Sequence, residues 1–242
     1  MSMFFCREIT ETMEKTARDF CGAVLPVFIH FAAVSFLSMA GETFFPGTDT
    51  GLRVTGVTVL AAAMCTPLFT AMYRRDLRRG RFPAGECSDE KKRRWEIPAA
   101  LLFALCLAAG AACSAAAGAA MRLLGMYRLF SNETQEVLLS SPPALQIIGI
   151  GLIVPVFEEL LYRGLVYGRV RSLIPRRWAM ILCSLLFAAG HGNVIQALYA
   201  FPMAILLIAL YERDRSLAAP VLFHIGANMF TVVMHLLGAA AA

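Results

Sequence analysis

The sequence is poor in charged residues and lacks the cysteine pairs that build disulfide frameworks or thiolate metal clusters. Of its 242 residues, 16% are charged and 58% are hydrophobic, and the mean hydropathy is +0.64. Average soluble domains are about one quarter charged. The seven cysteines form no Cys-x-x-Cys pair, and we interpret them as small buried hydrophobic residues. This composition excludes an ordinary soluble domain and predicts a polytopic membrane protein.

Several protease signatures are also missing. The chain has no His-Glu-x-x-His pair of a site-2-type metalloprotease. It has no Gly-x-Ser of a rhomboid-like serine site, no Gly-x-Gly-Asp of a presenilin-like aspartyl site, and no Gly-x-Ser-x-Gly elbow. Residues 1–20 are charged and amphipathic and carry no small-residue cleavage pattern, so we expect a cytoplasmic N-terminal segment rather than a cleaved signal peptide.

Long apolar runs predict an all-α fold, a membrane bundle of about seven transmembrane helices. Each run is about as long as a bilayer crossing requires, except for a short sixth one. Helices are the expected spanning elements because a backbone in lipid must satisfy its own hydrogen bonds. The predicted spans are residues 21–40, 52–73, 97–124, 144–162, 178–197, 198–212 and 217–237.

Lysine and arginine are concentrated in alternate loops. The loop 74–95 carries nine of them, and basic residues also follow the fourth span and fill the segment 211–216. The positive-inside rule then places the N-terminus in the cytoplasm and the C-terminus outside. We interpret the basic loop as topogenic and as a contact for anionic lipid, so the bilayer is an expected partner and nucleic acid is not. Residues 21–130 would hold three accessory helices, and residues 140–238 a catalytic core.

Ionisable residues in a membrane span cost about 2.5–3.5 kcal/mol each on insertion scales, so they are functional candidates by default. Glu159 and Arg163 lie four residues apart, share one helix face and are predicted to pair. Glu158 is rotated by about 100° and is left without that arginine. An unpaired carboxylate facing the interior of a bundle can serve as a general base. The alternative is that both glutamates merely mark an interfacial helix end.

Two further spans bring His191, His224 and Asn228. Each of these alone is more typical of a structural residue, because a buried histidine is often simply satisfied and asparagine often joins membrane helices. Together with the glutamates they favour one shared polar site. Glu158, His191 and His224 could hold a metal ion such as Zn²⁺ with an open position. The same groups could instead activate a water molecule without metal, and both alternatives lead to hydrolysis.

These motifs resemble those of one protease family. Residues 158–163 (EELLYR) fit Glu-Glu-x-x-x-Arg, residues 187–191 (FAAGH) fit Phe-x-x-x-His, and residues 224–228 (HIGAN) fit His-x-x-x-Asn. Their order and spacing resemble the CAAX protease and bacteriocin-processing family (CPBP, or Abi), whose eukaryotic members are type II CAAX prenyl endopeptidases. The resemblance covers roughly residues 140–237, with no departure at the six motif positions.

The resemblance implies an intramembrane endopeptidase. Glu158 would activate water, with Glu159 and Arg163 as its structural and electrostatic support. His191 would bind or activate the water, directly or through a metal, and His224 and Asn228 would line the oxyanion site or complete a metal site. Zinc and a metal-free, glutamate-activated water are both compatible with the family.

We therefore expect hydrolysis of a small or membrane-associated peptide, such as a prenylated or leader peptide, in a bacterial plasma membrane. The site is expected to open towards the cytoplasmic half of the bilayer. Two alternatives stay open: a non-hydrolytic bacteriocin self-immunity or scaffold protein, and a transporter with a carboxylate proton relay. The depths of the three motifs do not meet if every span is straight, so we predict a tilt of the fifth helix or a bend near Gly190 and Gly192.

Overall fold

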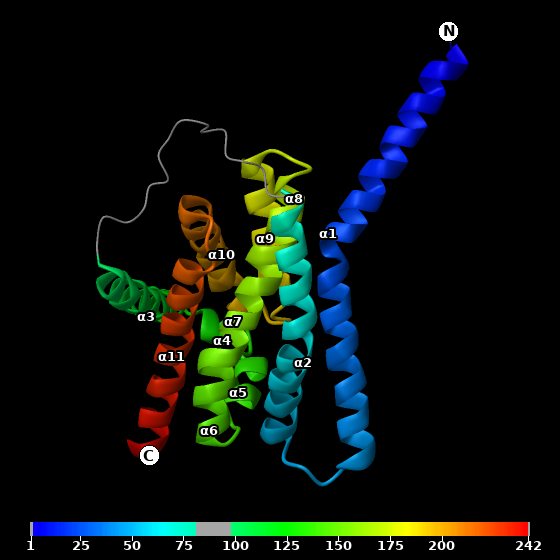
Figure 1. Ribbon diagram of the computed structural model, residues 1–242. Helices are drawn as coiled ribbons and strands as arrows, with labels where there is room; N and C mark the ends of the chain where they lie inside the picture. Colours follow the sequence, from blue (N-terminus) through cyan, green and yellow to red (C-terminus); the bar gives the residue numbers. More distant parts are fainter. Residues whose placement is uncertain (1, 81–97, 242) are drawn as a thin grey trace.

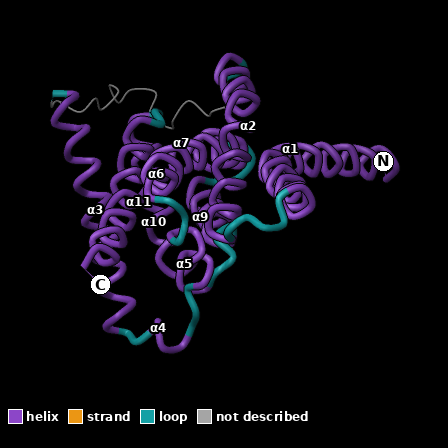
Figure 2. Tube along the Cα trace, turned by 90° about the horizontal axis from the view of Figure 1, so that it is seen from below, coloured by secondary structure: helices purple, strands orange, loops and turns teal. Residues whose placement is uncertain are grey.

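The computed structural model describes residues 2–80 and 98–241, and every regular element in these ranges is a helix (Figures 1 and 2). The predicted all-α class is thereby confirmed. Among the described residues, six helices are long and apolar enough to cross a membrane, close to the predicted seven. They are Thr16–Phe44, Thr50–Arg78, Ala99–Leu123, Pro143–Arg171, Val194–Arg213 and Ala218–Gly238.

The N-terminal part of the fold is built from three long helices. Helix α1 (Ser2–Phe44) and α2 (Thr50–Arg78) form an antiparallel pair, and Asp49 caps α2 by accepting a hydrogen bond from the Leu52 amide. Helix α3 (Ala99–Leu123) stands on the opposite side of the bundle from α1 (Figure 1). Most of the basic loop 74–95 lies outside the described residues, and the proposed division into 1–20, 21–130 and 140–238 stays a prediction.

The central helix is longer than predicted. The expected span 144–162 is part of a continuous helical stretch that runs from Pro143 to Arg171 between α1 and α3. It contains α6 (Pro143–Leu145), the π-helix η1 (Gln146–Ile153), α7 (Val154–Glu159), the π-helix η2 (Leu160–Tyr167) and α8 (Gly168–Arg171). Two short helices, α4 (Met126–Leu129) and α5 (Glu133–Leu139), precede it.

The predicted boundary between the fifth and sixth spans is wrong. Helix α9 (Arg176–Ala189) has 14 residues and stops well before residue 197, and α10 (Val194–Asp214) starts before residue 198. A turn at residues 190–193 separates them, with Gly192 at φ +64°. At 1.5 Å per residue, α9 is about 21 Å long and does not cross a 30 Å hydrocarbon core. The turn sequence, Gly-His-Gly-Asn, is a short polar interruption of the apolar run, and the predicted spans 178–197 and 198–212 passed over it.

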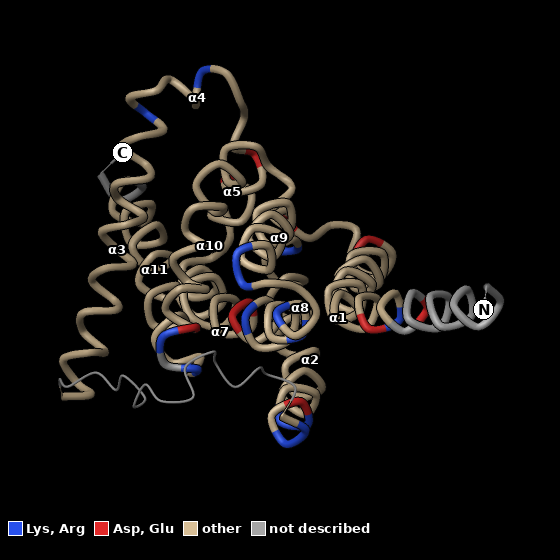
Figure 3. Tube along the Cα trace, turned by 90° about the horizontal axis from the view of Figure 1, so that it is seen from above, with Lys and Arg blue, Asp and Glu red and all other residues tan. Residues whose placement is uncertain are grey.

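Basic residues gather at one end of the bundle. Arg169 of α8 pairs with Asp76 near the end of α2 at 2.6 Å and donates to the Gly22 carbonyl of α1 at 2.8 Å. Glu212, near the end of α10, accepts a hydrogen bond from Tyr167 at 2.6 Å and pairs with Arg215 at 3.2 Å. Figure 3 views the molecule from this end, with Lys and Arg in blue. The C-terminus of α11 (Ala218–Ala241) lies at the opposite end (Figure 1).

Helices α3 and α11 approach each other through glycine. A Cβ atom added at Gly110 would overlap the carbonyl oxygen of Phe223, and one added at Gly226 would overlap that of Leu107. Small residues let membrane helices bring their backbones together in this way. The contact fixes α11, the helix that carries His224 and Asn228, against the accessory helix α3.

Candidate active site

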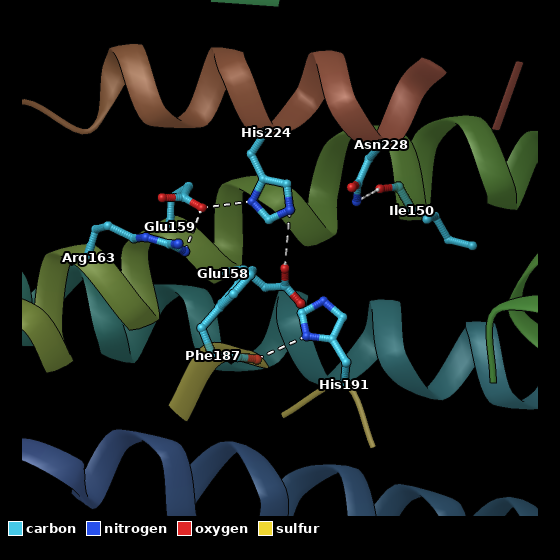
Figure 4. A network of polar contacts seen from close by, with 8 residues as sticks. All are labelled: Ile150, Glu158, Glu159, Arg163, Phe187, His191, His224 and Asn228. Atoms are coloured by element: carbon cyan, nitrogen blue, oxygen red, sulfur yellow. Dashed lines mark hydrogen bonds and ion pairs between the residues drawn. The ribbon is translucent and has the colours of Figure 1, made fainter. Parts of the chain in front are cut away.

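The buried centre of the site is an ion pair on the central helix. Arg163 Nη1 lies 2.9 Å from Glu159 Oε1, one helical turn away, and the side chains are 1% and 0% exposed. The predicted pairing of these two residues is present. A charge buried this deeply needs a partner, because desolvation of each ion costs several kcal/mol. The Glu159–Arg163 pair is therefore the buried centre around which the other side chains of the site lie (Figure 4).

His224 connects the two glutamates. Its Nδ1 atom lies 2.7 Å from Glu159 Oε1, and its Nε2 atom lies 3.6 Å from Glu158 Oε2. Because a carboxylate oxygen accepts, Nδ1 carries the proton and donates it to Glu159. This bond turns the Nε2 edge of the ring towards Glu158 (Figure 4). Helix α11 thus orients the carboxylate that the arginine leaves unpaired.

Glu158 is the more accessible of the two glutamates. Its side chain is 24% exposed, whereas that of Glu159 is fully buried. Figure 4 shows its carboxylate between the imidazole rings of His224 and His191. The neighbouring residues in sequence therefore have different environments, as the 100° rotation per residue predicts.

His191 reaches the site from the turn after α9. Its Nδ1 atom donates to the Phe187 carbonyl at 2.9 Å, which leaves Nε2 with a lone pair in the neutral ring. Because α9 ends at Ala189, His191 is held at the middle of the bundle and not along a continuous span. The predicted bend near Gly190 and Gly192 is thus a complete interruption of the helix.

Sequence reasoning underestimated Phe187. Its ring faces the Arg163 guanidinium, with 4.3 Å from Cζ to the ring centroid, a cation–π contact that adds to the buried pair. The same ring makes edge contacts with His191 at 4.9 Å and His224 at 5.8 Å between centroids. Its carbonyl also fixes His191. The Phe-x-x-x-His spacing could have predicted the contact between Phe187 and His191, because residues four apart lie on one helix face.

Asn228 is bonded to a backbone carbonyl that its sequence motif does not predict. Its Nδ2 atom donates to the Ile150 carbonyl at 3.1 Å (Figure 4). At the end of η1 the amide of Val154 donates to the carbonyl of Gly149, five residues earlier. By the same spacing, the carbonyl of Ile150 would accept a hydrogen bond from the amide of residue 155, which is proline. Proline has no N–H, and the Ile150 carbonyl is therefore left for Asn228. The second N–H of this amide group is not needed for this bond.

Two asparagines fix the turn that carries His191. Asn193 accepts from the Gln196 amide at 3.2 Å and so caps α10, while its Nδ2 atom donates to Asn132 at 3.1 Å. Asn132 in turn donates to Gln135 of α5 at 3.0 Å. The sequence analysis did not single out these residues. The cap signal at Asn193 was available, whereas its contact with Asn132 joins residues 61 positions apart.

One histidine of α1 also lies near the site. The His30 ring packs on Phe157 at 4.6 Å between centroids, next to Glu158 in the chain. The sequence analysis did not name His30, although a histidine in an apolar span was a readable signal. Its presence shows that α1 covers one side of the catalytic helix.

The three motifs meet at a common depth because the central helix is long. Glu158 lies 13 residues before Arg171, about 20 Å along the helix, and His191 lies 15 residues after Arg176, about 22 Å. The predicted span that ended at residue 162 placed Glu158 too close to the membrane surface. All six predicted residues now share one site, with Asn228 at its edge.

A metal ion would need Glu158, His191 and His224 as ligands. Within the described ranges, no three His, Cys, Asp or Glu side chains come together as a metal-binding group. His224 Nε2 lies 3.6 Å from Glu158 Oε2, and the Nδ1 atoms of His191 and His224 are bonded to the Phe187 carbonyl and to Glu159. The Nε2 atoms of both rings are therefore the ones that face the site, and a histidine tied at Nδ1 in this way can also bind a metal. The chemistry of the three residues is that of a carboxylate flanked by two oriented imidazoles, which can hold and deprotonate water.

Comparison with known proteins agrees with this arrangement. Residues 140–230 match the family model of the Rce1-like type II CAAX prenyl endopeptidases. A curated protein of Bacillus subtilis (strain 168), described as "Putative membrane peptidase YdiL", is 27% identical over 108 residues, which cover 44% of each chain. The chain thus spans less than half the length of this relative in the match. No solved structure is similar at a significant level.

The matched segment contains Glu158, Glu159, Arg163, His191, His224 and Asn228. Residues 140–230, the part of this chain that carries the whole site, are similar to the Rce1-like type II CAAX prenyl endopeptidases.

Proposed function

We propose that the protein is an intramembrane endopeptidase in which Glu158 is the general base. The observation that carries this proposal is the contrast between the two adjacent glutamates. Glu159 is sealed in an ion pair with Arg163, while Glu158 is 24% exposed beside two histidines on other helices. A pair of adjacent carboxylates with such different environments is typical of a divided structural and chemical role.

The proposed reaction begins with a water molecule held by Glu158 and by the Nε2 lone pair of His191. Glu158 takes one proton from this water as its oxygen attacks the carbonyl carbon of the scissile peptide bond. The tetrahedral intermediate then collapses, the carbon–nitrogen bond breaks, and the protonated Glu158 gives its proton to the leaving amine. Water is consumed, and one carboxylic acid and one amine are released.

His224 and Asn228 support this chemistry from α11. The ring of His224 is fixed beside Glu158, because its Nδ1 atom is bonded to the buried Glu159 and its Nε2 atom lies 3.6 Å from Glu158 Oε2. Asn228 is proposed to offer its second amide hydrogen to the oxyanion that forms at the carbonyl oxygen. A preorganised donor of this kind contributes about 10²–10³-fold to kcat in other hydrolases.

The proposed mechanism is metal-free. It is supported by the partly exposed carboxylate of Glu158, which lies beside two imidazoles that are each oriented through Nδ1. The measurement that decides this point is activity with and without a chelator, together with the metal content of the purified protein. Activity that falls with chelation and returns with stoichiometric zinc would contradict the metal-free mechanism and favour the zinc alternative.

The proposed substrate is a small or membrane-associated peptide, such as a prenylated or leader peptide, cleaved within the bilayer. The proposed location is a bacterial plasma membrane, which the Bacillus subtilis relative supports. The arginines gathered at the ends of α2, α8 and α10 support a cytoplasmic position for that end and for the N-terminus.

The test is a cleavage assay in proteoliposomes with a quenched fluorogenic peptide library. Glu158→Gln keeps the size of the side chain and removes the base, so kcat should fall by about 10²–10⁴-fold while the protein still inserts and folds. Glu133→Gln, an exposed glutamate on α5, is the matched control and should cleave normally. Full cleavage by Glu158→Gln would refute the proposal. Protection from a bacteriocin that survives this substitution would instead favour a non-hydrolytic immunity protein.

A further inference from the structure

A cavity lies beside α11, further along this helix than His224 and Asn228. It has a volume of about 190 Å³ and lies between α11, the C-terminal half of α3, α4, α5 and the start of α10. Thr231 lines it, and Thr231 is three residues beyond Asn228 and seven beyond His224. This spacing places all three on one face of α11, with the cavity about 10 Å further along the helix than His224.

The wall of the cavity is polar and carries one kind of charge. Among the described residues that line it, Arg122 is the charged side chain, and no aspartate or glutamate is present. The Arg122 guanidinium folds back over Gly118, one turn earlier in α3, where a Cβ atom would stand 3.7 Å from Nη2. The guanidinium therefore lies at van der Waals distance above Gly118, beside the cavity.

The same wall is tied to the catalytic turn. Ser114 and Thr231 form a hydrogen bond at 3.0 Å, and the Tyr199 hydroxyl donates to Gln135 at 3.2 Å. Gln135 also accepts from Asn132, which holds Asn193, two residues after His191. The cavity and the site therefore share one network of side chains, and a group bound in the cavity lies in a fixed relation to His191.

We propose that this cavity is a substrate subsite that binds a carboxylate of the peptide through Arg122. The inference rests on the proposed endopeptidase function. A guanidinium is the side chain best suited to bind a carboxylate, since its planar N–H groups match the two oxygens. An extended peptide advances about 3.3 Å per residue, so the carboxylate would stand about three or four residues from the scissile bond.

The size of the cavity favours part of a peptide over a whole small molecule. Pockets for complete small ligands measure about 300–1,000 Å³, well above this cavity. One acidic side chain, or the last residue of a peptide, suits the available space. These two sources offer the same chemistry, and the choice of peptides can separate them.

The experiment measures KM and kcat for the fluorogenic peptide that the wild-type protein cleaves fastest, in versions with each carboxylate removed. An acidic side chain is replaced by its amide, or the C-terminus is amidated. Loss of the bound carboxylate should raise KM about 10-fold with little change in kcat, because the contact is made before the reaction as well as in it. The version that shows this effect identifies the source.

Arg122→Gln should raise KM for the acidic peptide to the level of the neutral one and leave the neutral one unchanged. Arg128→Gln, on α4 and outside the cavity wall, is the matched control and should change neither value. Arg122→Glu should prefer a peptide with lysine at the same position, a result that a purely structural arginine would not produce.

Equal KM values for acidic and neutral peptides in the wild-type protein would overturn the subsite while leaving the endopeptidase intact. So would an Arg122→Gln effect that is the same for both peptides or that depends only on anionic lipid in the vesicle. Absence of any Glu158-dependent cleavage in the wild-type protein would overturn both proposals, which separates the two kinds of failure.

Discussion

The central helix and α1 differ in a way that their hydropathy does not reveal. In Thr16–Phe44 the most apolar window has a mean hydropathy of 2.1, and 11% of its residues are buried. In Pro143–Arg171 the corresponding window has a mean hydropathy of only 1.8, yet 44% of its residues are buried. The less apolar helix is the one inside the protein. In a membrane, lipid is as apolar as leucine, so hydrophobicity alone does not drive a helix to the centre of a bundle.

The difference arises from ionisable side chains. Glu159 and Arg163 must be kept from lipid, and the surrounding helices do this by enclosing them. Helix α1 has no such requirement over most of its length and exposes Phe28, Phe36 and other large apolar side chains. Burial in this molecule is thus organised around polar groups, and substitutions can test whether these groups or the apolar contacts dominate.

The largest effect is expected from breaking the buried ion pair. Arg163→Ala leaves Glu159 charged, fully buried and without its cation, and removes the cation–π contact with Phe187. Removing one partner of a buried pair costs about 3–5 kcal/mol. The free energy of unfolding in detergent, measured by thermal or denaturant unfolding, should fall by this amount.

A matched control for this change is Arg177→Ala, whose guanidinium lies over the ring of the exposed Trp178. It should cost less than about 1 kcal/mol, since exposed cation–π contacts contribute about 0.5–1 kcal/mol. Similar losses for the two arginines would show that burial of the Glu159 pair is not what holds the central helix in place.

A smaller effect is expected where α3 meets α11. Gly226→Ala would place a methyl group against the backbone of Leu107, which cannot move aside as a flexible side chain can. Overpacking of this kind costs about 1–3 kcal/mol. The measurement is the same unfolding experiment, and cleavage should also weaken because α11 carries His224 and Asn228.

Gly238→Ala, in the same helix but with open space around it, is the control for Gly226→Ala. It should leave stability unchanged within about 0.5 kcal/mol. If both substitutions are harmless, the close approach of α3 and α11 does not contribute to stability.

The sequence supported correct predictions wherever a short-range pattern determined the outcome. Helical spacing was enough to pair Glu159 with Arg163 and to separate Glu158 from them. Apolar runs located the helices that are long enough to span, and three motifs in order predicted the resemblance to the family whose model matches residues 140–230. These features need only a few residues and a single helix geometry.

The features that escaped prediction depend on contacts between distant segments. The sequence analysis predicted a tilt or a bend near Gly190 and Gly192, but not the complete break at residues 190–193 that places His191. The bond from Asn228 to Ile150 requires a π-helical segment and Pro155, and the sequence indicates only the proline. The network from Asn193 to Asn132 joins two loops that no local pattern relates. Such contacts become visible only when the chain is folded.

The smallest effect is expected on the lipid-facing side of α1. Phe28 is 66% exposed, and Phe28→Leu replaces one apolar group by another at a surface that faces acyl chains. Because the substituted side chain meets lipid in the folded state and still meets lipid when the helices separate, the change in stability should stay below about 0.5 kcal/mol.

The comparison is Phe157→Leu, because the Phe157 side chain is only 2% exposed and contacts His30 and Phe69. It should cost more than about 1 kcal/mol through the loss of packed aromatic contacts. Equal losses of stability at positions 28 and 157 would mean that a further partner covers α1 in the membrane. The difference in burial between α1 and the central helix would then hold only for the chain without that partner.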